Sequence, residues 1–249
     1  MVQSVDRAIS ILKCFNERKR ELKLSEIAEQ LGLNKSTVHG IINTLKFHGL
    51  IEQDEKSQKY RLGLYLIMLG ETVVNSLDVR SFGLPIVEDI CQKLEETVHV
   101  CVLDCTDIVY IDKRECANSI RISTKIGSKF PAYCTADGKV LISYLDRSKQ
   151  LRIIPDDIPK FTTNTITDKM EFVNQLDKIR ENGYAIDNEE YEVGLVCVAA
   201  PVLDHTGSPK YGISVTGPRI RMTEDKIQEA IDVLKDAAHR ISVRLGYKG

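Results

Sequence analysis

The residues with the clearest chemistry lie in a short segment near the N-terminus, residues 34–47. Apolar side chains recur there at helical spacing, at Val38, Ile41, Ile42 and Leu45. The opposite face carries short hydrogen-bonding groups and one cation, at Ser36, His39, Gly40, Asn43 and Lys46. Such groups suit the phosphates and base edges of a DNA major groove.

A preceding helix and a following hairpin must position this face. The stretch from Leu24 to Leu31 is expected to be helical, and Gly32 ends it at a turn that suits a left-handed residue. Asn34 can cap the next helix. After Gly49, the run LIEQDEKSQKYRLG indicates two short strands around a polar turn, as in a wing. A helical pair with a hairpin also occurs in unrelated domains. The order of turn, polar face and wing favours a winged helix–turn–helix whose second helix reads DNA.

Charge is distributed unevenly along the chain. Its 249 residues favour two domains, and the formal net charge is -2. Residues 1–63 hold 11 basic and 8 acidic side chains, whereas the remainder holds 23 basic and 28 acidic ones. The basic excess coincides with the DNA-reading motif. Because it is small, we expect DNA affinity to require more than one copy of the unit.

The seven cysteines favour a reducing compartment. Their number is odd, none forms a CxxC pair and no signal peptide precedes them, so we expect free thiols in a cytoplasmic protein. No apolar run approaches the ~20 residues of a membrane span, so no membrane partner is expected. An alternative is a thiol- or metal-responsive site formed by His99, Cys101, Cys134, Asp187 and Cys197. No established zinc spacing supports it, and buried free cysteines are usually packing residues.

Two further helices are expected in the N-terminal part of the chain. Residues 3–16 carry an apolar stripe that would pack under the reading pair. Residues 64–77, LYLIMLGETVVNSL, are apolar on too many sides for a lone surface helix, so they require a partner, either the other domain or a second subunit. The expected divisions are a winged helix–turn–helix at 1–62, a linker helix at 63–79 and a C-terminal domain at 80–249.

The C-terminal domain alternates helices with strands. Helices are expected at 84–97, at 135–145 with Thr135 as N-cap, from Thr167 to Gly183, and over the apolar repeat from Ile227 to Leu245. Strands are expected in two runs within 98–115, at 119–126 and 184–187, and in the pair 194–203 and 210–217. Strands that pair mainly with sequence neighbours imply a mixed α/β (α+β) fold on a mostly antiparallel sheet.

Several segments together resemble a known family over nearly the whole chain. They are QSVDRAISIL, LSEIAEQLGLNKSTVHGIINTL, ETVHV, IGSKFPAYCTADGKVLISYL, and the long block GYAIDNEEYEVGLVCVAAPVLD with GISVTGPRIRMT. The chain is similar to IclR-type transcriptional regulators of bacteria. That resemblance implies a winged helix–turn–helix, a linker helix and a profilin/GAF-like domain that binds a small organic acid, sugar acid or aromatic effector. It also implies a homodimer or dimer of dimers on double-stranded promoter DNA, repressing or activating catabolic genes.

The resemblance implies which side chains face DNA. From the reading helix these are Lys35, Ser36, Thr37, His39, Gly40, Asn43 and Lys46, and from the wing Tyr60 and Arg61. Family members often carry an arginine where this chain has Gly40. Losing that guanidinium removes a typical guanine or phosphate contact, which affects the operator sequence more than DNA binding itself.

The resemblance also implies effector contacts, at Ile122, Ala136, Asp137, Asp187, Leu195, Cys197, Ser214 and Thr216. Strand parity agrees in part, since Leu195 and Cys197 share one strand face, as do Ser214 and Thr216. Hydroxyls, a thiol and an acid beside an apolar floor could fix a small polar ligand, and the amides that open the Thr135 helix suit a carboxylate. Asp137 replaces a small residue common in the family. Either it acts as a first-turn helix acid, or it narrows the pocket, or it repels an anion and favours hydroxyl-rich ligands.

Two other classes of protein compete with a regulator. A cysteine enzyme with His99 as base is compatible with a GAF-like fold, but a fused DNA-reading unit favours sensing over turnover, so we expect no catalytic residues. A structural DNA-bending protein would leave the C-terminal domain without a purpose. The sequence therefore predicts a ligand-responsive DNA-binding regulator with no cofactor and no bound metal. It leaves the effector, the operator and the sign of regulation open.

Overall fold

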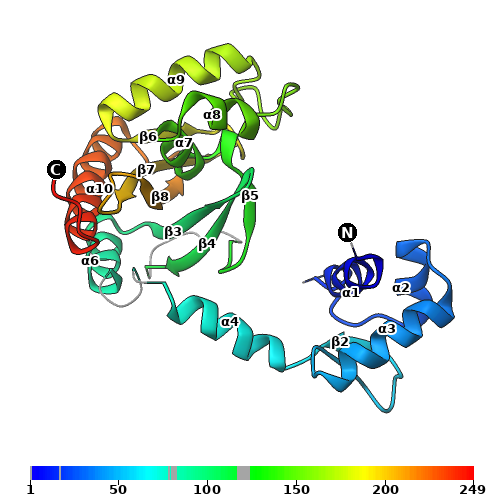
Figure 1. Cartoon of the computed structure of the whole chain (residues 1–249). Helices are drawn as coiled ribbons and strands as arrows, with labels where there is room; N and C mark the ends of the chain where they lie inside the picture. Colours follow the sequence, from blue (N-terminus) through cyan, green and yellow to red (C-terminus); the bar gives the residue numbers. More distant parts are fainter. Residues whose placement is uncertain (1, 17, 78, 80–82, 117–123) are drawn as a thin grey trace. The chain divides into compact units, whose positions relative to one another are not determined.

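The chain folds into two units, Met1–Ser76 and Leu77–Gly249, in a computed structural model that describes residues 2–16, 18–77, 79, 83–116 and 124–249. Both units are drawn in Figure 1. Within the described residues, no helix has the length and apolar character needed to cross a bilayer.

The N-terminal unit is a winged helix–turn–helix. Its elements are α1 (Gln3–Lys13), α2 (Leu24–Leu31), α3 (Lys35–Phe47), β1 (Ile51–Gln53), β2 (Tyr60–Leu62) and α4 (Tyr65–Asn75). Gly32 ends α2 with a left-handed φ of 63°, as its position predicts. Asn34 occupies the N-cap position of α3, but its side chain makes no capping hydrogen bond. The first helix is shorter than expected, and beyond its end Asn16 accepts hydrogen bonds from the backbone N–H groups of Arg18 and Lys19.

A six-stranded antiparallel sheet forms the centre of the second unit. Its strands are β3 (Thr97–Asp104), β4 (Asp107–Arg114), β5 (Lys129–Pro131), β6 (Ala185–Asn188), β7 (Leu195–Leu203) and β8 (Pro209–Pro218). Their order across the sheet is β5-β4-β3-β8-β7-β6, and every neighbouring pair is antiparallel. The expectation of a mostly antiparallel sheet is confirmed.

Helices cover both faces of this sheet. Figure 1 shows α6 (Leu84–Leu94) and α10 (Glu224–Arg244) on one side, and α7 (Ala136–Ser143), α8 (Arg147–Ile153) and α9 (Lys169–Asn182) on the other. A 3-10 turn, η1 (Ala132–Cys134), precedes α7, and all eight residues of α7 are buried. Because side chains alternate along a strand, the even positions of β3 join the apolar core under α6 and α10, while Cys101 and its odd-numbered neighbours face α7. Two separate apolar cores, one on each face, therefore share one sheet.

Several element boundaries differ from the sequence-based expectations. The helix expected to reach residue 97 ends at Leu94, because Glu95 adopts a left-handed φ of 53° and Thr97 already belongs to β3. Asp168, not Thr167, caps α9 by accepting the backbone N–H of Glu171 at 2.7 Å.

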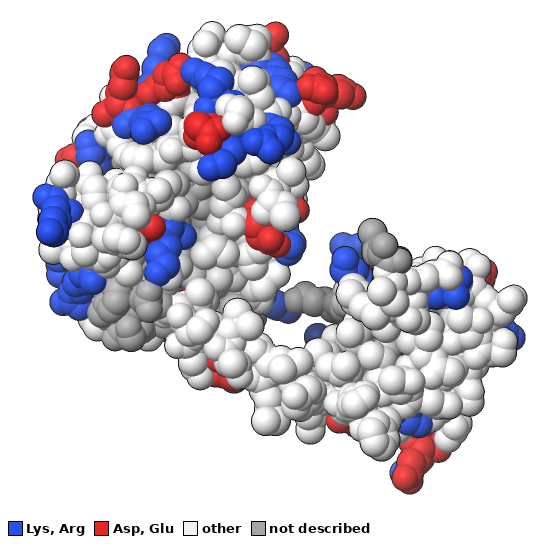
Figure 2. Space-filling view, in the orientation of Figure 1, with Lys and Arg blue, Asp and Glu red and all other residues white. Residues whose placement is uncertain are grey.

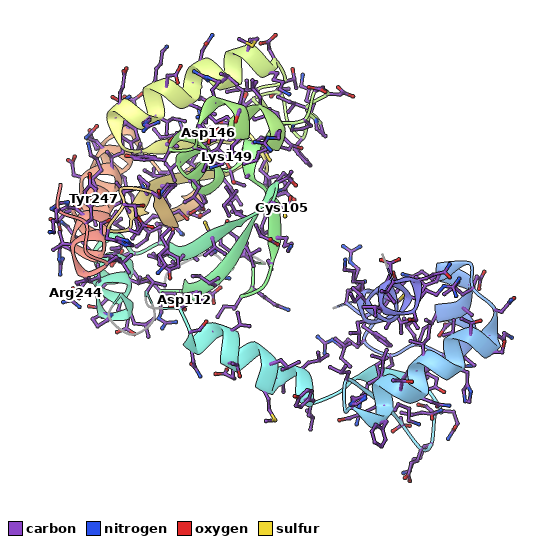
Figure 3. The ribbon with its side chains drawn as sticks, viewed as in Figure 1. Cys105, Asp112, Asp146, Lys149, Arg244 and Tyr247 are labelled. Carbon is purple, nitrogen blue, oxygen red and sulfur yellow. A yellow bond between two sulfur atoms is a disulfide. The ribbon has the colours of Figure 1, made fainter. Side chains whose placement is uncertain are left out.

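The helix α8 and the short strand β5 were not expected from the sequence. The helix α8 begins at Arg147 and is capped by Asp146, whose carboxylate accepts the backbone N–H of Lys149 at 2.9 Å; Figure 3 labels Asp146 and Lys149. The short β5 pairs with β4. Of the strand expected at 119–126, residues 119–123 lie outside the described residues and 124–126 are not in a strand.

The cysteines do not all conform to the expectation of free thiols. Cys91 and Cys116 are joined in a disulfide, which corrects that expectation for this pair. The five other cysteines are free: Cys14, Cys101, Cys105, Cys134 and Cys197. Of these only Cys105 is exposed, at the tip of the β3–β4 hairpin (Figure 3).

Candidate DNA-binding and effector sites

The outward face of α3 carries the side chains expected to contact DNA. Lys35, Ser36, His39, Gly40 and Asn43 are exposed, and Thr37 and Lys46 are half-buried. The opposite face packs into the unit's core through Val38, Ile42 and Leu45. This division is the amphipathic pattern of a helix whose polar face is free to enter a groove.

Hydrogen bonds organise part of this face before any DNA is bound. Asn43 Nδ2 lies 3.4 Å from His39 Nδ1, one helical turn away. Lys46 donates to Gln53 Oε1 at 2.8 Å and so connects α3 to the wing. In the wing, the guanidinium of Arg61 is 3.1 Å from the carboxylate of Glu52, and both remain partly exposed. A DNA phosphate would therefore compete with Glu52 for Arg61.

Among the residues expected to contact DNA, Tyr60 is buried and Gly40 has open space around it. The Tyr60 side chain is only 4% exposed and packs in the core of the unit, so it is withdrawn from the expected DNA contacts. At Gly40, an added Cβ would meet no atom within 4 Å. Packing therefore does not require a glycine at this position. The missing side chain leaves a gap on the exposed face of α3.

A small cavity lies between α7 and the sheet in the second unit. Its volume is about 60 Å³. The lining side chains come from all six strands or their connections and from the start of α7: His99, Tyr110, Thr124, Phe130, Thr135, Asp137, Asp187, Tyr191, Glu192, Leu195, Cys197 and Thr216. Strand register explains part of this convergence, since Asp187 pairs with Cys197, and Cys197 pairs with Thr216.

Five of the eight residues expected to contact an effector line this cavity: Asp137, Asp187, Leu195, Cys197 and Thr216. Ala136 and Ser214 are fully buried and belong to the same elements, α7 and β8, without lining it. Ile122 lies outside the described residues. Cys197 Sγ is 3.1 Å from the Thr216 hydroxyl, so these two residues of neighbouring strands lie on the same face of the sheet.

Asp187 has both a structural and a lining role. Its carboxylate accepts the backbone N–H of Glu190 at 2.7 Å and so closes the turn after β6. Burial raises its pKa to about 7, while Lys139 opposes the rise. Lys139 itself is fully buried, and its ammonium donates to Glu190 Oε1 and to the carbonyl of Ile186. A buried pair of this kind must stay together, because removing one partner leaves an unpaired charge in the core.

Asp137 is 1% exposed at the first turn of α7. Burial raises the pKa of its carboxyl to about 7. Ser214 and Cys101 face this carboxyl and offset part of the rise, although neither reaches Oδ1 with the geometry of a full hydrogen bond. Asp137 therefore lies in the first turn of α7, as expected, but it is buried; the helix is capped by Thr135, whose hydroxyl accepts the backbone N–H of Gly138.

The most informative residue that the predicted effector set omitted is His99. Its ring is 1% exposed, stacks on Tyr110 with centroids 4.4 Å apart, and places Nε2 2.7 Å from the Thr124 hydroxyl. Burial lowers its pKa to about 3, so the ring is neutral at physiological pH. The alternation of His99 with valines along β3 was the signal that could have placed it on the polar face.

The cysteines at this site have weakly acidic thiols. Burial raises the pKa of Cys101, Cys134 and Cys197, which disfavours the nucleophilic thiolate. Among the described residues, no group of three or more His, Cys, Asp and Glu side chains is arranged to hold a metal ion.

Comparison with known proteins identifies both units. The profile of the bacterial transcriptional regulator IclR C-terminal family matches residues 71–243, and that of the IclR helix–turn–helix domain matches residues 4–55. The chain belongs to the IclR family. The regulator KdgR of Escherichia coli K12 is 36% identical over 248 residues, which cover 99% of this chain and 94% of that protein.

Solved IclR-family structures share the fold. The IclR of Thermotoga maritima is 34% identical with a TM-score of 0.77, and the match covers 99% of this chain and 100% of that one. An IclR homologue from Microbacterium hydrocarbonoxydans, crystallised with 4-hydroxybenzoate, is 20% identical with a TM-score of 0.86; the match covers 98% of this chain and 99% of that one. As an IclR-family protein, this chain is a ligand-responsive transcriptional regulator with an N-terminal DNA-binding domain and a C-terminal effector-binding domain. The relatives are called regulators and repressors, which favours a regulator over an enzyme.

Proposed function

We propose that the effector of this regulator binds in the cavity between α7 and the sheet, contacting Asp137, Asp187, Cys197 and Thr216. The observation that carries the proposal is a set of buried polar atoms without hydrogen-bond partners in the described part of the chain: Thr97 Oγ1, His99 Nδ1, Asp137 Oδ1 and Ser214 Oγ. Buried polar groups are nearly always satisfied in folded proteins, so a cluster of unsatisfied ones beside a cavity favours a polar ligand or ordered water there.

The effector is a small organic acid, sugar acid or aromatic molecule that controls a catabolic operon. Ligand pockets usually measure roughly 300–1,000 Å³. The cavity is much smaller, at about 60 Å³, so such a molecule requires movement of lining side chains. Phe130 and Tyr191, whose rings stack edge to face at 5.3 Å, are only partly buried and are the natural groups to move. This rearrangement would give the ligand a preference for one conformation of the domain, which is what coupling to DNA affinity requires.

The DNA-binding surface is the exposed face of α3 with Arg61 of the wing, acting on double-stranded promoter DNA. We include Lys35, Ser36, Thr37, His39, Gly40, Asn43 and Lys46 in this surface. A helix N-terminus with short polar side chains and a flanking cation suits simultaneous base and phosphate contacts. Repression by blocking a promoter is the sign of regulation that we propose.

The regulator acts as a homodimer or dimer of dimers, and α4 supplies the contact between subunits. Not one residue of α4 is buried, and Leu64, Ile67, Met68 and Val73 are each more than 60% exposed. The face of α4 visible in Figure 2 is mostly uncharged. An apolar helix of this kind gains free energy by pairing with a second copy, and two copies present two reading helices to a DNA site.

The test of the effector site removes hydroxyl groups at nearly constant size. In the Ser214→Ala/Thr216→Val double variant, we expect roughly fivefold weaker effector binding, since Thr216 lines the cavity and one lost hydrogen bond contributes about 1 kcal/mol. Operator DNA is first selected from random duplexes with the full-length protein, and effectors are found by thermal shift among organic, sugar and aromatic acids. Thr206→Val is the matched control, because Thr206 is an exposed hydroxyl in the β7–β8 turn. If the double variant binds the effector and responds on DNA like wild type, the site lies elsewhere.

A further inference from the structure

The charged residue types that line the cavity are all acids. Asp137, Asp187 and Glu192 line it, and no lysine or arginine does so in the described part of the chain. The buried cation on α7, Lys139, is already bonded to Glu190 and to a backbone carbonyl of β6. A ligand carboxylate in this cavity would therefore find acids without a free basic partner.

Asp137 is held in place by close packing of its helix turn on η1 and of its carboxyl on β8. A Cβ added to Gly138 would lie 2.1 Å from the carbonyl oxygen of Ala132, so the start of α7 packs directly on η1. A Cβ added to Gly212 would lie 3.3 Å from Asp137 Oδ1 and 2.9 Å from Cys101 Sγ, so the carboxyl lies directly against β8. Asp137 has no room to turn away from a ligand without displacing these neighbours.

The unsatisfied oxygen of Asp137 calls for a hydrogen-bond donor. Oδ1 has no partner in the described part of the chain, and the nearby Ser214 hydroxyl is also unpaired. A ligand hydroxyl can donate to an ionised carboxylate, whereas a ligand carboxylate has no proton to donate and adds a like charge at short range. Discrimination between the two groups is therefore built into this position.

We propose that Asp137 is the specificity-determining residue of the effector site. When it is ionised, it selects hydroxyl-rich ligands and rejects a ligand carboxylate at this position. An anionic effector therefore binds only when Asp137 takes up a proton. The proton is taken from solvent and is held on the Asp137 carboxyl, which then donates to the effector. This inference rests on the proposed effector site and specifies its chemistry.

The surroundings of Asp137 are compatible with this protonation. The titratable groups that line the cavity with Asp137 or interact with it are His99 and Cys101 of β3, Tyr110 of β4, Asp187 of β6, Tyr191 and Glu192 of the β6–β7 connection, and Cys197 of β7. Helices α8 and α9 pack on α7 through the side-chain amide of Gln150 and through apolar residues. Burial already raises the pKa of Asp137 to about 7, so its protonation is accessible near neutrality.

Matched pairs of alditols and aldonates test the proposal, because each pair differs only in a terminal hydroxymethyl or carboxylate group. We would measure binding of xylitol and xylonate, and of sorbitol and gluconate, to the full-length protein by calorimetry at about pH 6 and about pH 8.5. For wild type, we expect aldonate affinity to fall by at least tenfold over this range, while alditol affinity does not fall. In Asp137→Asn, aldonate affinity should be independent of pH.

Asp146→Asn is the control, since Asp146 is an exposed acid that caps α8 and does not line the cavity. It should retain the wild-type pH dependence for aldonates. The proposal is overturned if wild-type aldonate binding does not change with pH, if Asp137→Asn keeps the change, if Asp146→Asn removes it, or if no member of either pair binds. Failure of the effector site itself is distinguishable, because then Ser214→Ala/Thr216→Val would leave the binding of every effector unchanged.

Discussion

Replacing Asp137 with asparagine should make the free energy of unfolding less dependent on pH. The carboxyl ionises near pH 3.8 in an unfolded chain and near pH 7 in the folded protein. Between these values the unfolded state has released a proton that the folded state retains, so ionisation favours unfolding. The stability cost is absent below the unfolded pKa, grows as pH rises, and is complete above the folded pKa.

The magnitude follows from the difference between the two pKa values. Each pH unit corresponds to about 1.4 kcal/mol, so the whole cost is at most ~4 kcal/mol, of which ~3 kcal/mol develops above pH 5. Asparagine has almost the same shape and no ionisation. We therefore expect Asp137→Asn to gain up to ~3 kcal/mol relative to wild type between about pH 5 and about pH 8. Asp187 is present in both proteins, so its own ionisation cancels in the comparison.

Urea unfolding followed by the near-ultraviolet circular dichroism of tyrosine measures this difference. The chain has no tryptophan, and seven of its nine tyrosines lie in the second unit, so the signal reports mainly the unit that contains Asp137. Asp146→Asn is the control. Asp146 is an exposed cap whose pKa is lowered by hydrogen bonds from Ser148 and Lys149, so it stays ionised in both states above about pH 5. Parallel stability profiles for wild type and Asp137→Asn across this range would refute the reasoning.

Three further substitutions test other parts of the structure. Gly40→Arg should tighten DNA binding, because the site has room for a side chain, and in anisotropy titrations it should steepen the salt dependence of affinity by about one released counterion. Gly40→Ala is the control and should change neither quantity. Equal salt slopes for Gly40→Arg and wild type would count against α3 as the reading helix. Gly212→Ala should lower stability by about 1–3 kcal/mol, since its Cβ would overlap Cys101 Sγ, and an unchanged melting temperature would show that this contact relaxes freely. Ile67→Glu/Met68→Glu should yield monomers in sedimentation, and a persistent dimer would place the subunit contact outside α4.

Local signals explain why much of the N-terminal unit was predictable. Gly32 adopts the left-handed conformation expected after α2, and the apolar spacing of Val38, Ile42 and Leu45 correctly marked the buried face of α3. Backbone conformation and helical periodicity depend on residues a few positions apart, so a single sequence contains them. Tyr60 was misassigned because a tyrosine in a wing can point to solvent or to the core, and only packing decides between them.

In the second unit, the sequence alone determined which residues alternate along each strand, and thus that Leu195 shares a face with Cys197 and Ser214 shares a face with Thr216. The tertiary structure decided which of those faces is polar, and how far each ionisable group is removed from water. Lys139 meets a carboxylate 51 residues away, and Glu96 lies buried between Arg221 and Lys226, 125 and 130 residues away. Asp137 is an ordinary first-turn helix acid by sequence. Its pKa is raised because burial among η1, β3 and β8 removes it from water, and desolvation depends on neighbours in space, not on neighbours in the chain.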